Sequence, residues 1–231
     1  MPKNSINYKN FNMAKYVFLI AALLFSITGF PQEHFRKEQI TTPKNTQFGF
    51  ILSPNIGWMH VDNIQGYNTK SVVRPGFSCG VLADLNLTSN YFFSTAIIVT
   101  GINGRLNYPN IADIISTNYK LQYIEIPLTL KLKTNLTTYG RFYGQFGLGT
   151  GIKISGTETG GSIEGPINHT TEVGNDFRAS LIAGAGTEWA ISSGLNLQTG
   201  LVLNYGLTNA ASSLNYNFKN NYLMLSLGLF F

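Results

Sequence analysis

The final residues of the chain, 221–231 (NYLMLSLGLFF), alternate leucine with smaller or more adaptable residues and end on an aromatic residue. Successive side chains of a β-strand point to opposite faces, so this spacing separates one strongly apolar face from one mixed face. The apolar face would carry Leu223, Leu225, Leu227, Leu229 and Phe231, and the mixed face Met224, Ser226 and Gly228. A strand between lipid and a filled lumen requires this pattern. The segment therefore predicts the closing strand of a membrane β-barrel.

The composition favours a membrane barrel over a soluble domain or a helical membrane protein. Charged residues make up 12% of the chain, against roughly 25% in typical soluble domains. The mean hydropathy is nevertheless only +0.04, which is low for a bundle of membrane helices. The formal net charge is +5, but the basic residues are dispersed, so we expect no nucleic-acid binding. The single cysteine, Cys79, excludes an internal disulfide.

Other segments alternate in the same way, and the spacing between them predicts the topology. With the closing strand they cover residues 48–58, 74–87, 91–102, 119–133, 141–155, 177–191, 194–206 and 221–231. The connections are alternately short (88–90, 134–140 and 192–193) and long (59–73, 103–118, 156–176 and 207–220). We therefore predict an all-β fold, an eight-stranded antiparallel up-and-down transmembrane β-barrel with short periplasmic turns and long extracellular loops.

The charged residues of these segments fall on the face that is poorer in large apolar side chains. They are Asp84, Glu125, Lys131, Arg141, Arg178 and Glu188, and the opposite face is almost uncharged. A soluble barrel of the lipocalin type would have apolar residues inside and charged residues outside. The reverse arrangement favours lipid around the barrel. It also predicts that these charged residues form a polar network in the lumen.

The N-terminal residues predict export to the outer membrane. Lys15 precedes the apolar run 16–25 (YVFLIAALLF), which is followed by small and polar residues, as in a secretory signal peptide. The run is too short for the ~20 residues of a membrane-spanning helix. We expect a signal peptide at residues 1–31, with Met13 as an alternative start. A short periplasmic segment at 32–47 and the barrel domain at 48–231 would follow.

One segment carries a more specific motif. Residues Tyr123-Ile124-Glu125-Ile126-Pro127-Leu128, continuing into Leu130-Lys131, resemble the Tyr-Leu-Glu-Ile-Pro-Leu strand of the PorT-like outer membrane β-barrel proteins, often labelled the porin family. The segment Arg74-Pro-Gly-Phe-Ser-Cys-Gly and the terminal aromatic residue are similar to that family's second and last strands. The resemblance covers about residues 48–231. It implies an outer membrane location and, from the family's best-known member, a role in assisting type IX secretion.

Glu125 lies within this motif, on the face expected to point into the lumen. A buried carboxylate requires a charged or hydrogen-bonded partner, and Lys131, Arg141 or Arg178 could supply one from a neighbouring strand. Two interpretations remain open, a salt-bridge network that rigidifies the barrel and a gate or proton-responsive element. Pro127 has no amide hydrogen for the ladder, and we expect a bulge there that re-aims Glu125.

The expected width of the barrel limits its function. About eight strands leave an interior just wide enough for side chains, which argues against a bulk diffusion porin. We expect a non-enzymatic accessory of protein secretion or envelope assembly, without cofactor or metal. A surface adhesin or ligand-binding barrel that acts through its long loops is the alternative. A lipid-modifying enzyme is the third interpretation. Its candidate residues are His60 with Asp62 and Ser71, and His169 with Ser162 and Asp176.

The expected partners are outer membrane lipid, the barrel-insertion machinery and secretion-machinery subunits. The closing strand, with Leu227, Leu229 and Phe231, resembles the C-terminal signal that insertion machinery reads. Glycines also recur at every second position, at Gly147, Gly149 and Gly151 and again at Gly184 and Gly186. This spacing places them on the lumen face, where we expect them to make room for larger side chains.

Overall fold

The computed structural model describes residues 45–61, 70–107, 116–137, 140–161, 170–172, 174–192, 194–210 and 218–231. Within these ranges no helix is long and apolar enough to cross a membrane. The expected signal peptide at residues 1–31 and nearly all of the segment 32–47 lie outside the described residues.

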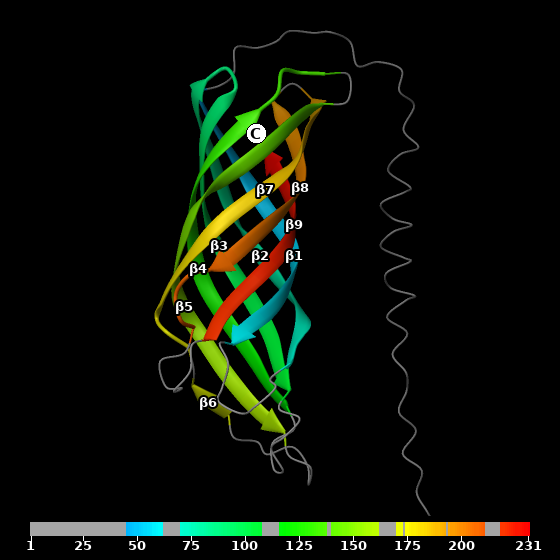
Figure 1. Cartoon of the computed structure of the whole chain (residues 1–231). Helices are drawn as coiled ribbons and strands as arrows, with labels where there is room; N and C mark the ends of the chain where they lie inside the picture. The colour runs from blue at the N-terminus through cyan, green and yellow to red at the C-terminus, as the bar shows by residue number, and fades with distance from the viewer. Residues whose placement is uncertain are drawn as a thin grey trace, which may run out of the picture. The chain divides into compact units, whose positions relative to one another are not determined.

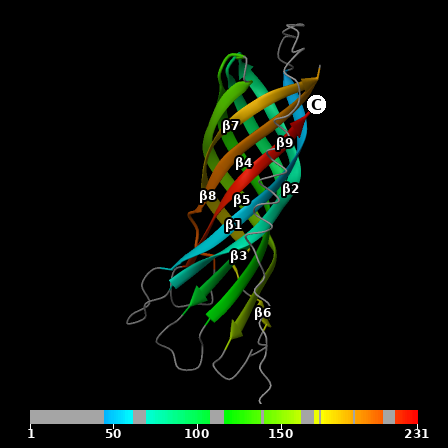
Figure 2. The same ribbon diagram turned by 90° about the vertical axis from the view of Figure 1, so that its right-hand side faces the viewer.

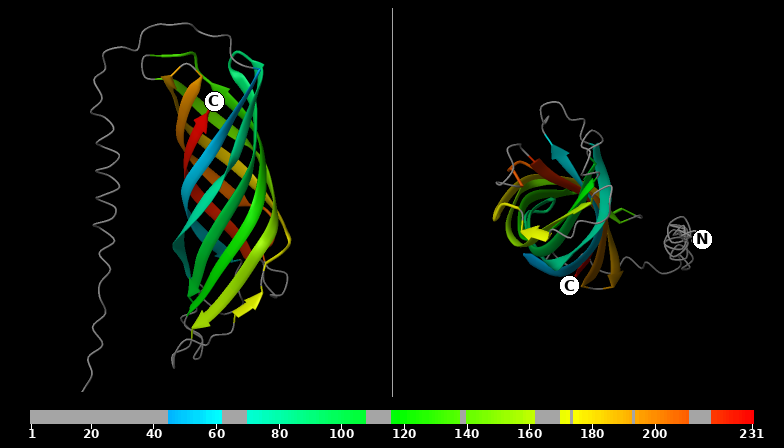
Figure 3. Two further views of the ribbon diagram at one scale, coloured as in Figure 1. Left: turned by 180° about the vertical axis from the view of Figure 1, so that it is seen from behind. Right: turned by 90° about the horizontal axis from the view of Figure 1, so that it is seen from below.

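The described strands form one antiparallel sheet that closes on itself. They are β1 (Thr46–Val61), β2 (Lys70–Thr88), β3 (Tyr91–Asn107), β4 (Ser116–Lys133), β5 (Arg141–Gly161), β6 (Thr170–Glu172), β7 (Phe177–Ser192), β8 (Leu195–Gly206) and β9 (Phe218–Phe230). Each long strand pairs with the next long strand, and β9 pairs with β1 (Figures 1 and 3). The short β6 only extends the sheet at the end of β5. The other eight strands form the ring, and the predicted barrel is confirmed.

Several strands are longer than expected at the end that carries the long connections. β3 continues to Asn107 and β5 to Gly161, past the expected ends at residues 102 and 155. In Figure 2, β4 and β5 extend farther towards this end than β8 and β9. The outward residues of β3 change there from Ile97 and Val99 to Asn103 and Arg105. An apolar alternation therefore stops where the strand leaves lipid, although the β-ladder continues.

Large apolar side chains cover the outer face of the ring. Phe50, Leu148 and Ile152 are more than half exposed, at 56%, 55% and 65%. We call these residues and their exposed neighbours the apolar belt, whose members include Phe48, Leu52, Val81, Ile97, Val99, Ile124, Ile126, Leu128, Phe146, Ile154, Leu181, Leu201 and Leu203. The inward residues of the same strands are buried, and many of them are polar. Contact of the belt with water would be unfavourable, whereas contact with acyl chains is not.

The lumen near the long connections is filled by apolar and aromatic side chains. Ile102, Leu106 and Leu121 are completely buried. The rings of Tyr119 and Phe218 pack with their centroids 4.9 Å apart. The sequence did not predict this apolar core. Its residues point inward at the ends of strands where the outward residues, such as Asn103, Arg105 and Lys120, are polar or charged, the reverse of the pattern that the rest of the barrel follows.

The structure has no bulge at Pro127, so this prediction is wrong. The β3–β4 register is the same on both sides of this residue, because Thr95 pairs with Leu128 and Ile98 with Glu125. The ladder with β5 also passes through Pro127 without a shift, and its irregularity lies at Gln122. Because Pro127 has no amide hydrogen, the pairing of β4 with β3 is interrupted at this residue. Neither strand has an extra residue there, so no bulge forms. Glu125 points inward by the ordinary alternation of the strand.

Candidate functional site in the lumen

Four charged side chains form a cluster in the lumen near the short turns, which we call the turn-side cluster: Asp84, Lys131, Lys133 and Glu188. Asp84 Oδ2 lies 2.9 Å from Lys131 Nζ and 3.1 Å from Lys133 Nζ. Lys133 also pairs with Glu188, and Ser94 donates a hydrogen bond to Asp84 Oδ1 at 2.6 Å. All of these side chains are buried. Their positive and negative charges cancel, which is the condition for keeping ions in a protein interior.

Aromatic rings from three strands surround the two lysines of the turn-side cluster. Lys133 Nζ lies 4.3 Å from the ring centroid of Phe92, and Lys131 Nζ lies 5.4 Å from that of Tyr143. The ring of Phe230 lies within 5.3 Å of Lys131 Nζ and 5.7 Å of Lys133 Nζ. Ammonium groups are attracted to aromatic faces at such distances. The penultimate residue of the chain is therefore part of the buried cluster.

A second set of residues forms the central cluster, which joins β4, β7, β8 and β9: Glu125, Arg178, Asn204, Asn220 and Tyr222. Arg178 Nη1 donates a hydrogen bond to Glu125 Oε1 at 2.6 Å. Its Nε and Nη2 donate to the side-chain oxygens of Asn220 and Asn204, at 2.7 Å and 2.6 Å. The hydroxyl of Tyr222 donates to Glu125 Oε2 at 2.6 Å. Both carboxylate oxygens and three guanidinium nitrogens thus have partners within the lumen.

A glycine on the intervening strand allows the central ion pair to form. Gly151 on β5 is the cross-strand neighbour of Glu125 on one side and of Arg178 on the other. A Cβ atom at this position would lie 3.2 Å from Glu125 Cγ and 3.6 Å from Arg178 Cβ. Any larger side chain would occupy the space in which the two charged groups meet. The absence of a side chain on β5 therefore brings β4 and β7 into contact across it.

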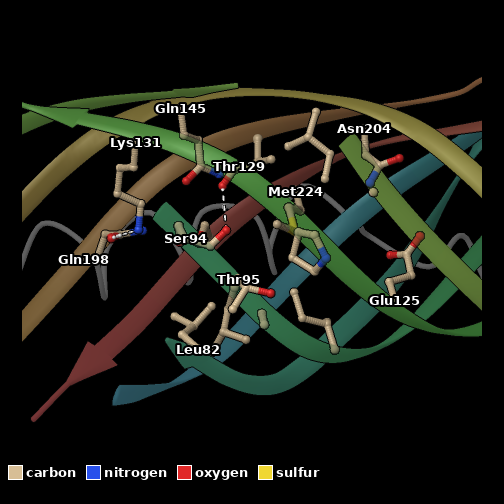
Figure 4. Close-up of a pocket in the computed structure, with 18 of the residues that line it drawn as sticks. Leu82, Ser94, Thr95, Glu125, Thr129, Lys131, Gln145, Gln198, Asn204 and Met224 are labelled. Atoms are coloured by element: carbon tan, nitrogen blue, oxygen red, sulfur yellow. Dashed lines mark hydrogen bonds between the residues drawn. The ribbon is translucent and has the colours of Figure 1, made fainter. Parts of the chain in front are cut away.

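A cavity of about 40 Å³ lies between the two clusters (Figure 4). Lys131 and Gln198 line one end of it, where Lys131 Nζ donates a hydrogen bond to Gln198 Oε1 at 3.0 Å. Glu125 and Asn204 line the other end, and apolar side chains such as Met224 lie between them. A water molecule needs roughly 10–15 Å³ of such space, so the cavity has room for a few waters. Around this cavity, buried side chains of the described strands fill the lumen.

Comparison with known families places the chain among outer membrane proteins. Residues 29–212, well over half of the chain, match the model of the outer membrane protein beta-barrel domain. The chain belongs to this family. The predicted outer membrane localisation is thereby confirmed, and the apolar belt of this outer membrane barrel faces the bilayer. The match does not distinguish a PorT-like protein from other members. No curated protein matches the sequence.

Several solved outer membrane proteins resemble this barrel at low sequence identity. Ail of Yersinia pestis is 15% identical with a TM-score of 0.41, and the match covers 81% of this chain and 99% of Ail. OprG from Pseudomonas aeruginosa is 13% identical with a TM-score of 0.45, over 80% of this chain and 94% of OprG. Neisserial surface protein A is 14% identical with a TM-score of 0.40, over 78% of this chain and 95% of that protein. Such likenesses do not indicate what this barrel binds.

Arg141 differs in placement from the other charged residues that the sequence grouped in a lumen network. Its Nε donates to the carbonyl oxygen of Thr134 and its Nη2 to that of Ser89, each at 3.1 Å. Both carbonyls belong to short turns, so Arg141 ties two turns together at the rim of the barrel. Asp84, Lys131 and Glu188 lie in the turn-side cluster, and Glu125 and Arg178 lie in the central cluster.

The residues proposed as an insertion signal lie on the outside of the closing strand. Leu229 and Phe231 are exposed and Leu227 is half-buried. The ring of Phe231 packs on that of Phe50 at 5.6 Å, and its amide donates to the carbonyl of Phe48 at 2.9 Å. In the closed barrel these contacts join the last strand to the first. Recognition of this strand by insertion machinery stays a proposal.

Several functional residues of the two clusters were missed by sequence reasoning. They are Lys133 in the turn-side cluster, Tyr143 beside it, and Asn204, Asn220 and Tyr222 in the central cluster. Each lies at an inward position of its strand, so the alternation could have identified them. On β9 the inward series of Met224, Ser226 and Gly228 continues back to Tyr222 and Asn220. The neutral residues were missed because the predicted lumen network contained only side chains with a formal charge.

Proposed function

We propose that this barrel is a non-enzymatic, non-conducting component of the outer membrane that assists protein secretion or envelope assembly through its two ends. The packed lumen supports this proposal most strongly. Two neutral clusters and an apolar core fill it, and the cavity between the clusters has space for only a few waters. The rims and the long connections are then the working surfaces. The secretion role rests on the resemblance of the strand 123–128 to PorT-like proteins.

The contacts of two candidate catalytic residues support a non-enzymatic role. The hydroxyl of Ser71 accepts a hydrogen bond from the backbone amide of Met59 at 3.1 Å. Asp176 pairs with Lys153, with 3.1 Å between Oδ1 and Nζ. Both residues therefore have partners elsewhere in the barrel domain, as residues with a structural role do. Asp62, Ser162 and His169 lie outside the described residues. We expect His60→Ala to leave the lipid profile of the envelope unchanged.

Affinity capture tests the accessory role. The tagged, full-length protein would be isolated from detergent-solubilised outer membranes, and co-purifying proteins would be identified by mass spectrometry. We expect recovery of secretion or envelope-assembly subunits that are absent from a capture with an unrelated barrel of similar abundance. Deletion of the gene should also reduce the amount of secreted cargo in the culture medium. Normal secretion, together with recovery of the bare barrel only, would contradict the proposal.

A surface adhesin or ligand-binding barrel is the second candidate. The extension of β3, β4 and β5 beyond the apolar belt favours it, because a rigid sheet would support the long connections outside the membrane. Replacing residues 62–69 and 108–115 by short Gly-Ser linkers should then abolish adherence or ligand binding while the barrel still inserts. The same replacements would leave an accessory that acts at its periplasmic rim functional. Measurements of insertion and secretion in these variants therefore separate the two candidates.

A further inference from the structure

The cations of this barrel divide into paired and unpaired groups. In the lumen, Lys131, Lys133 and Arg178 each form an ion pair with a carboxylate. Within the described ranges, no ion pair involves the four cations that lie near the long connections on β2, β3 and β4, which we call the basic face. Its members are Lys70, Arg74, Arg105 and Lys120.

Strand register places these cations on neighbouring strands. Lys120 on β4 lies opposite Asn103 on β3, and Arg105 is two residues farther along β3, opposite Asn118. Diagonal neighbours of this kind are about 7–8 Å apart, within reach of one ligand for long side chains. Lys70 on β2 lies opposite Asn107, and Arg74 follows Val73, whose partner Gly104 is the neighbour of Arg105 on β3. The basic face therefore concentrates positive charge over three adjacent strands.

The local hydrogen bonds orient Arg105 but leave most of its donors available. Its Nε donates to Asn118 Oδ1 at 2.6 Å, which fixes the plane of the guanidinium. The two terminal nitrogens can then donate side by side, a geometry that matches phosphate oxygens. Glu158 on β5 lies opposite the inward-facing Tyr119 and accepts a hydrogen bond from its hydroxyl at 3.1 Å, so this carboxylate is on the other face of the sheet from Arg105.

The basic face lies at the outer edge of the lipid-facing surface. On β4 the outward residues are Ile126 and Ile124 of the apolar belt, then Gln122 and Lys120. Lys120 is therefore four residues beyond Ile124, a separation of about 13 Å along a strand and less along the membrane normal because barrel strands are tilted. A lipid headgroup that projects from the bilayer occupies this level. The long connections place this edge on the outer leaflet side.

We propose that the basic face binds the phosphorylated sugar headgroup of a glycolipid in the outer leaflet, with Arg105 and Lys120 contacting phosphate. The unpaired charge supplies the attraction, and the adjoining belt contacts the acyl chains of the same molecule. Asn103 and Asn118 lie beside the two cations. Asn103 Nδ2 donates to the carbonyl of Pro75 at 2.6 Å and Asn118 Oδ1 accepts from Arg105, which leaves Asn103 Oδ1 and Asn118 Nδ2 for the sugar hydroxyls. A lipid bound in this way would hold the barrel in the outer leaflet. It would also cover the outward face of β3 and β4 beyond the apolar belt. This inference does not depend on the proposed function.

Binding of diphosphoryl lipid A to the full-length, detergent-folded protein tests the inference. Native mass spectrometry would count bound molecules over a titration, for the wild type, for Arg105→Gln/Lys120→Gln and for Lys219→Gln. The last variant removes a cation on β9 that forms no ion pair with the described residues and lies outside the basic face, and it is the matched control. We expect the double variant to bind about tenfold more weakly, as loss of two charge-assisted contacts implies, and the control to bind normally. Retention of heat-modifiable migration in gels would show that all three proteins are folded.

Two further ligands identify what is recognised. Lipid A without phosphate should bind the wild type and the double variant equally weakly, because only the phosphate groups contact the cations. Inositol hexakisphosphate, a soluble polyanion without acyl chains, should compete poorly with diphosphoryl lipid A. Equal affinity of all three proteins for diphosphoryl lipid A would overturn the inference. Binding of inositol hexakisphosphate as tight as that of diphosphoryl lipid A would assign the basic face to a soluble anion and would also overturn it.

Discussion

Arg178 and Glu125 meet directly across Gly151, with 2.6 Å between Nη1 and Oε1, although their strands are not neighbours in the sheet. The pair spans the width of β5 and lies against Tyr222 of the closing strand. Neither side chain contacts lipid, since both are buried within the lumen. The two strands are therefore joined by a charge contact through the interior as well as by the ladder in the wall.

Replacing Arg178 by methionine should leave the carboxylate of Glu125 buried without a cation. We expect the free energy of unfolding to fall by about 3–5 kcal/mol, the usual cost of breaking a buried ion pair. Urea titration of the protein folded in phospholipid vesicles, followed by tryptophan fluorescence, would measure this. Glu125→Gln/Arg178→Met should recover most of the loss because the uncompensated charge is removed. Equal stability of the single and double variants would contradict the ion-pair interpretation.

Gly200 should tolerate no methyl group while Tyr143 is present. A Cβ atom at Gly200 would lie 2.2 Å from the hydroxyl oxygen of Tyr143 and 2.7 Å from the carbonyl of Ala185. We expect Gly200→Ala to destabilise the barrel by about 1–3 kcal/mol, as overpacking of a filled interior does. The control is Gly144→Ala, where no atom lies within 4 Å of the added methyl.

Combination with Tyr143→Phe tests the origin of this effect. The phenylalanine removes the oxygen that the methyl group meets, so part of the stability lost in Gly200→Ala should return. The same unfolding titration would measure all four proteins, and the coupling energy follows from the double-mutant cycle. If the two substitutions were additive, the clash with Tyr143 would not explain the requirement for glycine.

The packed lumen should prevent ion flow through the wild-type barrel. In planar lipid bilayers we expect no stable conductance steps from the wild type. Glu125→Ala/Arg178→Ala removes both charged side chains and joins their volume to the existing cavity, so ion current should appear or increase. Gly144→Ala, which alters the outer face only, should behave as the wild type. Large, stable conductance of the wild-type protein would contradict the non-conducting role.

The last two residues of the chain should have separable effects. Phe230 is buried beside Lys131 and Lys133, and we expect Phe230→Ala to lower the free energy of unfolding by about 3–5 kcal/mol. Phe231 packs on Phe50 at the outer surface, and its deletion should mainly reduce the amount of inserted protein. Quantitative blotting of outer membranes and unfolding of the purified barrels would distinguish the effects. Normal membrane levels after deletion of Phe231 would contradict its role as an insertion signal.

The sequence predicted the barrel well because lipid and lumen impose opposite requirements on alternate residues. The strand 119–133 illustrates this, since its outward isoleucines and leucines oppose Glu125, Thr129 and Lys131. The prediction of strand ends and of inward residues failed near the long connections, where outward residues are no longer apolar and inward residues no longer polar. Ile102 and Leu106 point inward although they are apolar, and Asn103 and Arg105 point outward beyond the lipid. Alternation therefore located the membrane crossing but neither the apolar core nor the full length of β3.

The partners within the lumen could not be predicted from the sequence. Lys131, Arg141 and Arg178 were equal candidates for Glu125, because alternation says which side chains point inward but not at what height they lie. Height depends on strand register, and the register depends on turns and bulges such as that at Gln122. In the structure Arg178 is level with Glu125, Lys131 is level with Asp84, and Arg141 lies at the rim.

The contacts of Phe230 and Tyr222 with the two clusters constrain the order in which the barrel assembles. Lys131 and Glu125 lie on β4, yet their environments are completed only by β9, which follows all the other strands of the ring in the sequence. Until that strand arrives, the ions must remain hydrated, because a half-built sheet has nothing with which to replace their water. Ring closure by β9 therefore supplies the missing partners of both clusters. An open sheet without β9 would leave the charged side chains of both clusters exposed to water. Quality-control proteases could distinguish this open sheet from the closed barrel.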